Sequence, residues 1–282
     1  MSNPVLQVDD LRVTARSRLG EIVAVDELSL ELKPGDVLGL IGESGSGKTT
    51  TARSIIGLLE RNVRVDSGTI RFRGDVVYGD GVDRLKSLRG RHIGVIFQSA
   101  SSALNPLLRI GTQLKQVLKA NRPELSSSAA DQRMRRVLAR MGFSDPDRIL
   151  RAYPHQLSGG MRQRASIAIA VAPEPEVIIA DECTSALDVL VQAEVIDLLR
   201  ELVGELDTAM IFVTHDLMLA ADVCSHVSVM RYGKVVENGP ASSVMTSPQH
   251  EYTKALLDAV PTWVPSTAGD QYVTDPAAGG RT

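Results

Sequence analysis

The segment that most constrains this chain is the glycine-rich stretch GESGSGKT at residues 42–49, which follows an apolar run at residues 37–41. It matches the pattern G-x-x-x-x-G-K-[ST], and such a loop between a strand and a helix turns its backbone N–H groups toward phosphate oxygens. We expect Lys48 to reach the β- and γ-phosphates of a nucleotide and the Thr49 hydroxyl to bind Mg²⁺. A glycine-rich turn with a stray lysine is the alternative, and the strand-to-helix setting disfavours it. The predicted phosphate-binding residues are Gly42, Glu43, Ser44, Gly45, Ser46, Gly47, Lys48, Thr49 and Thr50.

A second apolar run, residues 177–180, ends in two carboxylates, Asp181 and Glu182. A buried parallel strand delivers the residues that follow it to the carboxyl edge of the sheet, where α/β proteins bind ligands. We expect Asp181 to hold Mg²⁺, generally through its water shell, and Glu182 to orient and deprotonate an attacking water. The alternative is that the two carboxylates simply lie in solvent at a strand end. The presence of a phosphate loop in the same chain disfavours this interpretation.

A third segment, LSGGMRQR at residues 157–164, places Ser158 directly before Gly159 and Gly160. Ser158 is expected to cap a helix, and the two glycines expose backbone N–H groups at its start, which makes a second anion site. One chain rarely needs two such sites for one nucleotide. From this segment alone, a simple serine-capped helix therefore stays open as the alternative.

Composition and charge bear on the function class. The chain has 282 residues, and its formal net charge of -3 favours neither nucleic acid nor an anionic membrane as a direct partner. The only two cysteines, Cys183 and Cys224, lack metal-ligand spacing, which argues against a disulfide framework or an iron–sulfur cluster.

The N-terminus has no basic region followed by an apolar stretch, so we expect no signal peptide. The longest uncharged apolar run, residues 165–173, is about half the length that crosses a bilayer, so membrane association is expected to need a partner.

The order of apolar segments predicts the fold class. Short β-branched runs alternate with helical periodicity, which is typical of a mostly parallel sheet with covered faces. Between residues 99 and 164 strand-like runs vanish and amphipathic segments appear, which predicts a helical lobe inserted into an α/β core. A hairpin is expected around Tyr232 and Gly233, and a loose tail over the last twenty residues. The expected strands cover residues 37–41, 93–97, 177–180 and 209–213, and the expected helices cover residues 48–59, 110–120, 129–141 and 189–206.

The segment around Ser158 resembles the signature motif of the ATP-binding-cassette (ABC) family, in which each subunit offers this anion site to the nucleotide on its partner's phosphate loop. Gln98 matches the family glutamine that joins the core to the helical lobe and senses Mg²⁺ and water. His215 matches the switch histidine that contacts the γ-phosphate, and residues 185–188 match the loop that crosses the dimer interface. The resemblance implies catalytic roles for Glu182, His215 and Gln98, metal binding by Thr49, Gln98 and Asp181, and nucleotide contacts by Ser158, Gly159, Gly160 and Asp188 besides the phosphate loop.

A closer resemblance, over about residues 6–261, is to the ATPase subunits of bacterial oligopeptide and dipeptide importers. It rests on the motifs at residues 42–48, 102–106, 153–156 and 250–257. The implied fold is α/β: a P-loop NTPase (RecA-like) core with an antiparallel β subdomain, an inserted α-helical subdomain and a small C-terminal extension. The implied segments are 1–98 (first part of the core), 99–164 (helical subdomain ending in the signature motif), 165–235 (second part of the core) and 236–282 (C-terminal extension and tail).

The same resemblance implies a subunit that binds and hydrolyses ATP, with Mg²⁺, to drive a bacterial importer of di- or oligopeptides. Implied partners are a second ABC ATPase subunit, expected to be a paralogue in a heterodimer, two integral-membrane permease subunits and an extracytoplasmic substrate-binding protein, but no nucleic acid. The implied location is the cytoplasmic face of the inner membrane, through the permeases. Asn105 and Pro106 are expected to contribute to the groove for a permease helix.

Two alternatives stay open at this point. One is a cassette ATPase subunit of a soluble, non-transport enzyme or repair assembly. The other is a nucleotide-binding regulatory module without turnover, and the presence of Glu182 together with His215 speaks against it.

Three departures from the family pattern matter. Cys183 stands where proline is usual, either as a small space-filling residue or as a redox-sensitive thiol, which the neighbouring carboxylates disfavour as a thiolate. Ala15 stands where family members place an aromatic ring against adenine, and Arg16 or Arg18 could stack instead. The cysteine-rich tail of many peptide-importer ATPases is missing, so no cluster is inferred.

Overall fold

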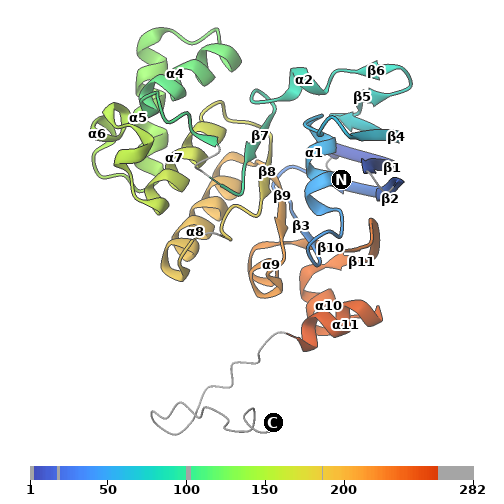
Figure 1. The fold of residues 1–282 in the computed structure, drawn as a ribbon. Coiled ribbons are helices and arrows are strands. Elements are labelled where there is room, and N and C mark those ends of the chain that lie inside the picture. Colours follow the sequence, from blue (N-terminus) through green and yellow to red (C-terminus); the bar gives the residue numbers. More distant parts are fainter. Residues whose placement is uncertain (1–2, 18–19, 100–102, 186, 260–282) are drawn as a thin grey trace, which may run out of the picture.

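Two β-sheets build the framework of the molecule, with one helix packed between them (Figure 1). The structure is a computed structural model that describes residues 3–17, 20–99, 103–185 and 187–259. Four sequence-based expectations fall outside these ranges, on Arg18, Ser102, Ala186 and the loose tail.

The larger sheet is the predicted, mostly parallel one, with six strands in the order β11-β10-β3-β9-β8-β7. Only β11 runs antiparallel to its neighbour, β10, and the turn between them is the predicted hairpin at Tyr232 and Gly233. Strands β3, β8 and β9 are buried at every residue because both faces of the sheet are covered, which explains their uninterrupted apolar sequences. The strands are β3 (Val37–Ile41), β7 (Ile93–Ile96), β8 (Val177–Asp181), β9 (Ala209–Thr214), β10 (His226–Arg231) and β11 (Lys234–Pro240).

The smaller sheet is antiparallel, with five strands in the order β2-β1-β4-β5-β6. An antiparallel subdomain is expected from the resemblance, but the sequence pattern alone does not locate its strands. The reason is local: the pairing of β1 with β2 shifts register between Val8 and Leu11 and again at Val13, and such bulges break a strict two-residue alternation. The strands are β1 (Leu6–Ser17), β2 (Gly20–Leu32), β4 (Val63–Phe72), β5 (Asp75–Gly79) and β6 (Val82–Asp83).

Helix α1 (Lys48–Ile55) lies between the sheets, where Ala52, Ile55 and Ile56 share one apolar cluster with side chains from both. The expected helix over residues 48–59 is too long. Helix α1 ends at Ile55 because Gly57, two residues further on, has a left-handed φ of 62° and donates its N–H to the Ser54 carbonyl, an arrangement that terminates helices. A short helix, α2 (Leu85–Leu88), follows the last strand of the smaller sheet. Helices α8 (Val189–Leu206) and α9 (Leu217–Val223) lie beside the larger sheet in Figure 1.

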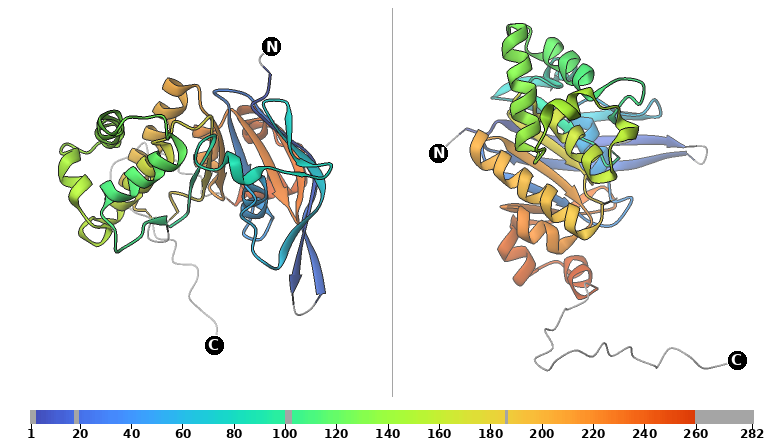
Figure 2. Two further views of the ribbon diagram at one scale, coloured as in Figure 1. Left: turned by 90° about the horizontal axis from the view of Figure 1, so that it is seen from above. Right: turned by 90° about the vertical axis from the view of Figure 1, so that its left-hand side faces the viewer.

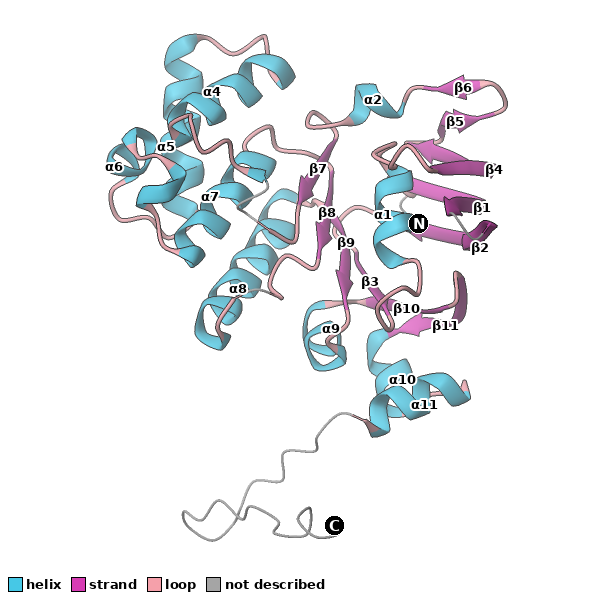
Figure 3. Ribbon diagram, in the orientation of Figure 1, coloured by secondary structure: helices cyan, strands magenta, loops and turns pink. Residues whose placement is uncertain are grey.

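Between β7 and β8 the described residues form helices and no strand, and Figures 2 and 3 show these helices gathered beside one edge of the larger sheet. Helix α5 begins two residues earlier than the apolar pattern suggests because the Ser126 hydroxyl accepts a hydrogen bond from the N–H of Ala129 and caps it. The helices are α4 (Ile110–Asn121), α5 (Ser127–Arg140), α6 (Pro146–Arg151), the 3-10 helix η1 (Pro154–Gln156) and α7 (Gly159–Val171).

After β11 the chain forms two short helices, α10 (Ala241–Thr246) and α11 (Glu251–Asp258), below the larger sheet in Figure 1. No helix in the described part of the chain is long and apolar enough to cross a membrane. The segment boundaries at residues 98, 164 and 235 stay predictions.

Candidate active site

The phosphate loop connects the end of β3 to the start of α1, as its sequence predicts. Gly42 and Gly47 have φ of 144° and 106°, in the region that favours glycine. A Cβ at Gly42 would lie 2.2 Å from the Met230 carbonyl oxygen, and one at Gly47 would lie 2.5 Å from the Ala24 carbonyl oxygen. The loop therefore packs backbone against backbone. Inside it, the buried hydroxyl of Ser46 has no hydrogen-bond partner among the described residues, which fits a loop built to receive a polar ligand.

Lys48 lies over this loop with only 4% of its surface exposed. Its ammonium group donates hydrogen bonds to the carbonyl oxygens of Gly42, at 2.7 Å, and Glu43, at 2.8 Å. Burial lowers the pKa of Lys48, and the nearby carboxylates of Glu182, Asp181 and Glu43 oppose that shift. The cation is thus held where phosphates on the loop N–H groups would meet it.

Thr49 and Asp181 meet across the gap between α1 and β8. The Thr49 hydroxyl donates a 2.9 Å hydrogen bond to Asp181 Oδ1, and burial raises the pKa of Asp181. A hydroxyl and a carboxylate are hard oxygen ligands, which Mg²⁺ prefers, and protein sites for this ion commonly supply one or two such groups and leave the rest to phosphates and water. The donor set fits Mg²⁺. Thr50 follows in α1, and its carbonyl accepts from the Ser54 hydroxyl.

The three predicted catalytic side chains come together. The Gln98 amide donates to Glu182 Oε2 at 2.9 Å, and His215 Nδ1 lies 3.5 Å from Glu182 Oε1. They follow β7, β8 and β9, three neighbouring strands. Glu182 has a left-handed φ of 45°, a strained conformation that is common in active sites, and its N–H donates to the Val213 carbonyl. Beside it lies a cavity of about 470 Å³ lined by Gly42, Glu43, Ser44, Glu182, His215, Leu217 and Leu256.

Gln98 has a second predicted role, in metal binding. Its amide nitrogen also lies 3.3 Å from the Ser185 hydroxyl. Both contacts of this nitrogen are therefore with Glu182 and the loop that follows it. No described contact joins Gln98 to Thr49 or Asp181. Metal binding by Gln98 stays a prediction.

The signature segment lies apart from the chain's own phosphate loop, as α7 and α1 do in Figure 1. Ser158 is the expected N-cap: its hydroxyl accepts from the N–H of Met161 at 3.3 Å. Gly159 faces open space, whereas a Cβ at Gly160 would lie 2.7 Å from Val191 at the start of α8. Asp188 caps α8 by accepting from the N–H of Val191 at 3.0 Å.

The structure adds contacts that the sequence did not indicate. The buried side chain of Gln163 donates a 2.7 Å hydrogen bond to the Cys183 carbonyl, which ties the signature helix to the end of β8. The only sequence indication of a role for Gln163 is its position in the segment at residues 157–164. Cys183 itself is 1% exposed, and burial raises the pKa of its thiol to about 12, which favours a small space-filling side chain over a reactive thiol.

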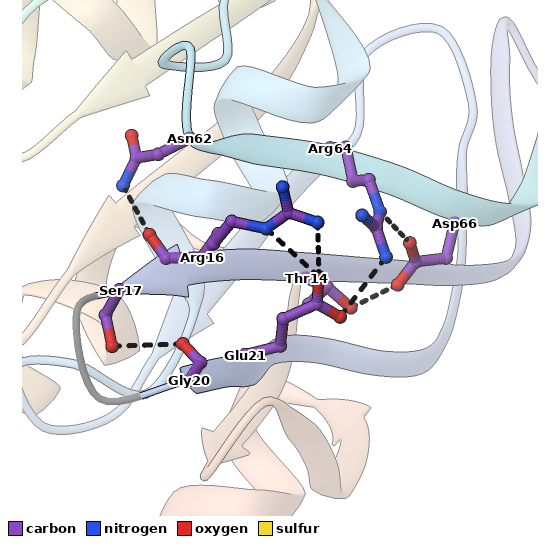
Figure 4. Close-up of polar contacts among 8 residues, drawn as sticks. All are labelled: Thr14, Arg16, Ser17, Gly20, Glu21, Asn62, Arg64 and Asp66. Atoms are coloured by element: carbon purple, nitrogen blue, oxygen red, sulfur yellow. Dashed lines mark hydrogen bonds and ion pairs between the residues drawn. The ribbon is translucent and has the colours of Figure 1, made fainter.

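The expected adenine side of the site lacks an aromatic ring. Ala15 pairs with Ile22 on β2 and with Val63 on β4. Successive side chains of a strand point to opposite faces, so Arg16 lies on the face opposite Ala15, where it bonds to Glu21 at 3.0 Å. Figure 4 shows this outer face, where the polar network also includes Thr14, Arg64 and Asp66. As placed, Arg16 is not available to stack on a base.

A glycine-rich loop opening α1, with polar side chains from three neighbouring strand ends beside it, defines a P-loop protein that acts on nucleotides. The particular family follows from comparison: residues 25–185, more than half of the chain, match the ABC transporter family. The chain belongs to the ABC transporter family.

Relatives and solved structures agree with this assignment. The chain is 41% identical to a putative peptide import ATP-binding protein of Brucella abortus, over 92% of this chain and 78% of the relative. It is 42% identical to the oligopeptide transport ATP-binding protein of Salmonella typhimurium, over 92% of this chain and 77% of the relative. CbiO1 of Clostridium perfringens, part of an ABC transporter complex, matches with a TM-score of 0.73 at 26% identity, over 87% of this chain and 92% of that one. A dimeric ATP-binding cassette bound to ADP and Pi matches with a TM-score of 0.73 at 27% identity, over 84% and 98%.

Proposed function

We propose that this chain is the ATP-binding and ATP-hydrolysing subunit of a bacterial importer of di- or oligopeptides. One observation carries the enzymatic part: Glu182 lies 2.9 Å from Gln98 and 3.5 Å from His215, at strand ends beside the phosphate loop. The peptide cargo is supported by the names of relatives about 40% identical over most of the chain, which are a putative peptide import ATP-binding protein and oligopeptide and dipeptide transport ATP-binding proteins.

In the proposed mechanism, the loop N–H groups and Lys48 bind the phosphates of ATP, and Glu182 orients the attacking water and takes its proton. His215 contacts the γ-phosphate, and Gln98 holds the Glu182 carboxylate in place. Thr49 and Asp181 would hold Mg²⁺, which neutralises charge on the β- and γ-phosphates when bound.

The proposed assembly is a dimer of two such subunits, closed head to tail around two nucleotides. Ser158, Gly159 and Gly160 would serve the partner's nucleotide, because α7, which they begin, lies apart from α1 and its phosphate loop in Figure 1. Asp188 begins the helix that packs against Gly160, so it belongs to the same contact region. The partner ATPase is proposed to be a paralogue.

The subunit is proposed to attach to two integral-membrane permeases at the cytoplasmic face of the inner membrane, served by an extracytoplasmic substrate-binding protein. The turn after Asn105 and Pro106 supports a docking role. The Gln113 side chain bonds to the Asn105 N–H and carbonyl, at 2.9 and 3.1 Å, and Leu107 in this turn is 82% exposed.

Purification in mild detergent from the source membranes tests this proposal. We expect the tagged chain to bring down a second cassette ATPase and two integral-membrane proteins. In vesicles, phosphate release by this complex should rise when a peptide-loaded binding protein is added. Recovery of the chain in a purely soluble complex would contradict the importer proposal and favour a non-transport ATPase.

A further inference from the structure

The phosphate loop is held on its outer side by two segments from much later in the chain. In the turn of the β10–β11 hairpin, the N–H of Gly233 donates a 3.0 Å hydrogen bond to the Ser46 carbonyl. From the first turn of α11, the Tyr252 hydroxyl oxygen accepts a 3.2 Å hydrogen bond from the N–H of Glu43. Both contacts are made to backbone groups of the loop.

Tyr252 is itself fixed in place. It is 6% exposed, and its N–H donates to His250 Nδ1 at 3.0 Å. The carboxylate of Glu237 on β11 accepts from the N–H groups of Gln249, at 2.7 Å, and His250, at 3.1 Å. The start of α11 is thus bonded to the edge strand of the larger sheet, so the tyrosine hydroxyl has a defined position.

Arg231 contacts one aromatic ring from each of the two segments that hold the loop. Its guanidinium lies 4.6 Å from the centre of the Tyr252 ring and 5.1 Å from that of Tyr232, within the range of cation–π attraction. One turn beyond Tyr252, Leu256 lines the cavity that also contains Glu182 and His215. The C-terminal extension therefore contacts the loop backbone and borders the catalytic cavity.

We propose that Tyr252 is a positioning residue of the nucleotide site, through which the C-terminal extension holds the phosphate loop in its binding conformation. The hydroxyl acts on the Glu43 amide and not on the nucleotide. Without it, the empty loop gains conformational freedom that nucleotide binding must remove, so affinity falls. The inference rests on the proposed function only in taking the loop's ligand to be a nucleotide.

The test is Tyr252→Phe in the full-length chain, which removes the hydroxyl and keeps the ring against Arg231. The matched control is Tyr232→Phe, because this second ring also contacts Arg231 and its hydroxyl has no hydrogen bond within the described part of the chain. We expect faster amide exchange at Glu43 in Tyr252→Phe only. Mg-ADP should bind about two- to tenfold more weakly, the range of one neutral hydrogen bond. In the assembled complex, KM for ATP should rise more than kcat falls.

The outcomes separate this inference from the proposed function. Unchanged Glu43 exchange in Tyr252→Phe, with unchanged Mg-ADP affinity, overturns the positioning role. Faster exchange along β3 and β9 as well overturns it too, because the hydroxyl would then support the whole fold. A wild-type chain that binds no nucleotide contradicts the proposed function. The exchange measurement still decides the contact in that case, since it needs no ligand.

Discussion

The side-chain amide of Gln98 donates a 2.9 Å hydrogen bond to Glu182 Oε2 across 84 residues of sequence. The register of the sheet explains this contact. Strands β7 and β8 are parallel, and Ile96 lies opposite Ala180, so the residues two positions beyond each partner emerge side by side at the carboxyl edge. Because Gln98 begins the connection to the helical lobe, this bond links that lobe directly to the predicted general base.

The first prediction concerns that base. Glu182→Gln should retain ATP binding and slow hydrolysis by about 10²–10⁴-fold, because the amide cannot take a proton from water. The variant should also accumulate an ATP-bound closed dimer. Phosphate release and size-exclusion chromatography with ATP would measure both effects. Glu201→Gln, at an exposed position on α8, is the control and should behave like wild type. Wild-type turnover in Glu182→Gln would remove Glu182 from the reaction.

The second prediction concerns Lys48. Lys48→Ala removes the cation held over the loop by the Gly42 and Glu43 carbonyls, so affinity for Mg-ATP should fall about 10- to 100-fold, the range of charge-assisted hydrogen bonds. Calorimetry on the isolated chain measures this, with the exposed Lys115→Ala as the control. Equal affinities of wild type and Lys48→Ala would mean that the loop is not the phosphate site.

The third prediction concerns the base of the nucleotide. With Ala15 in place of a ring, a stacking contribution of ~1 kcal/mol is missing, so ATP and GTP should be bound with less than about tenfold discrimination. Arg16→Ala should leave this ratio unchanged, because Arg16 is paired with Glu21 on the opposite face of β1. Competition binding with both nucleotides provides the measurement. A strong preference for ATP that Arg18→Ala abolishes would assign the stacking role to Arg18.

The fourth prediction concerns the two cysteines. Burial raises the pKa of both Cys183 and Cys224 to about 12, so at pH 8 only about one thiol in ten thousand is ionised. Iodoacetamide should therefore leave the folded chain unmodified and label both residues after denaturation. Mass spectrometry of peptides containing each residue reads this directly. Rapid labelling of Cys183 at pH 8 in the folded chain would revive a redox role.

The parts of the fold and site that could be predicted from sequence are those with local causes. The phosphate loop has a fixed glycine and lysine pattern, and the strands at Val37–Ile41 and Val177–Asp181 are uninterrupted apolar runs because they are buried on both faces. Strands β7, β8 and β9 are parallel neighbours in one sheet, so the polar residues that follow their ends lie close together. Glu182 could be predicted from its position after such a strand, whereas Gln98 and His215 follow from the resemblance to the ABC family.

The features that could not be predicted depend on contacts between residues far apart in the sequence, which no local pattern indicates. The strands β1 and β2 are half-buried and bulged, so their alternation is broken. The bond between Tyr252 and Glu43 spans 209 residues and depends on how α11 packs below the sheet. Gln163 lies within the signature segment, yet its partner is the Cys183 backbone, which only the tertiary packing of α7 brings close.

The last prediction concerns assembly and uses Ser158→Arg. In the proposed two-subunit arrangement Ser158 would face the partner's nucleotide, so a long cation there should abolish turnover at the partner's site. The phosphate loop of the mutated chain lies apart from its Ser158, so the ATP affinity of that chain should stay near that of wild type. The substitution also removes the hydroxyl that caps α7, which costs about 1 kcal/mol of stability. Ser126→Arg is the matched control, because it removes the equivalent cap from α5 in the same lobe.

The experiment pairs a Ser158→Arg chain with a partner whose own nucleotide site is intact and follows hydrolysis at each site by vanadate trapping of labelled nucleotide. Trapping should disappear at the partner's site in the Ser158→Arg pair and persist in the Ser126→Arg pair. The isolated wild-type subunit should bind ATP yet hydrolyse it slowly, since its γ-phosphate lacks the second anion site that stabilises charge in the transition state. If Ser158→Arg instead weakens ATP binding at its own loop and leaves the partner's turnover intact, one chain supplies its whole site, and the two-subunit model is wrong for this protein.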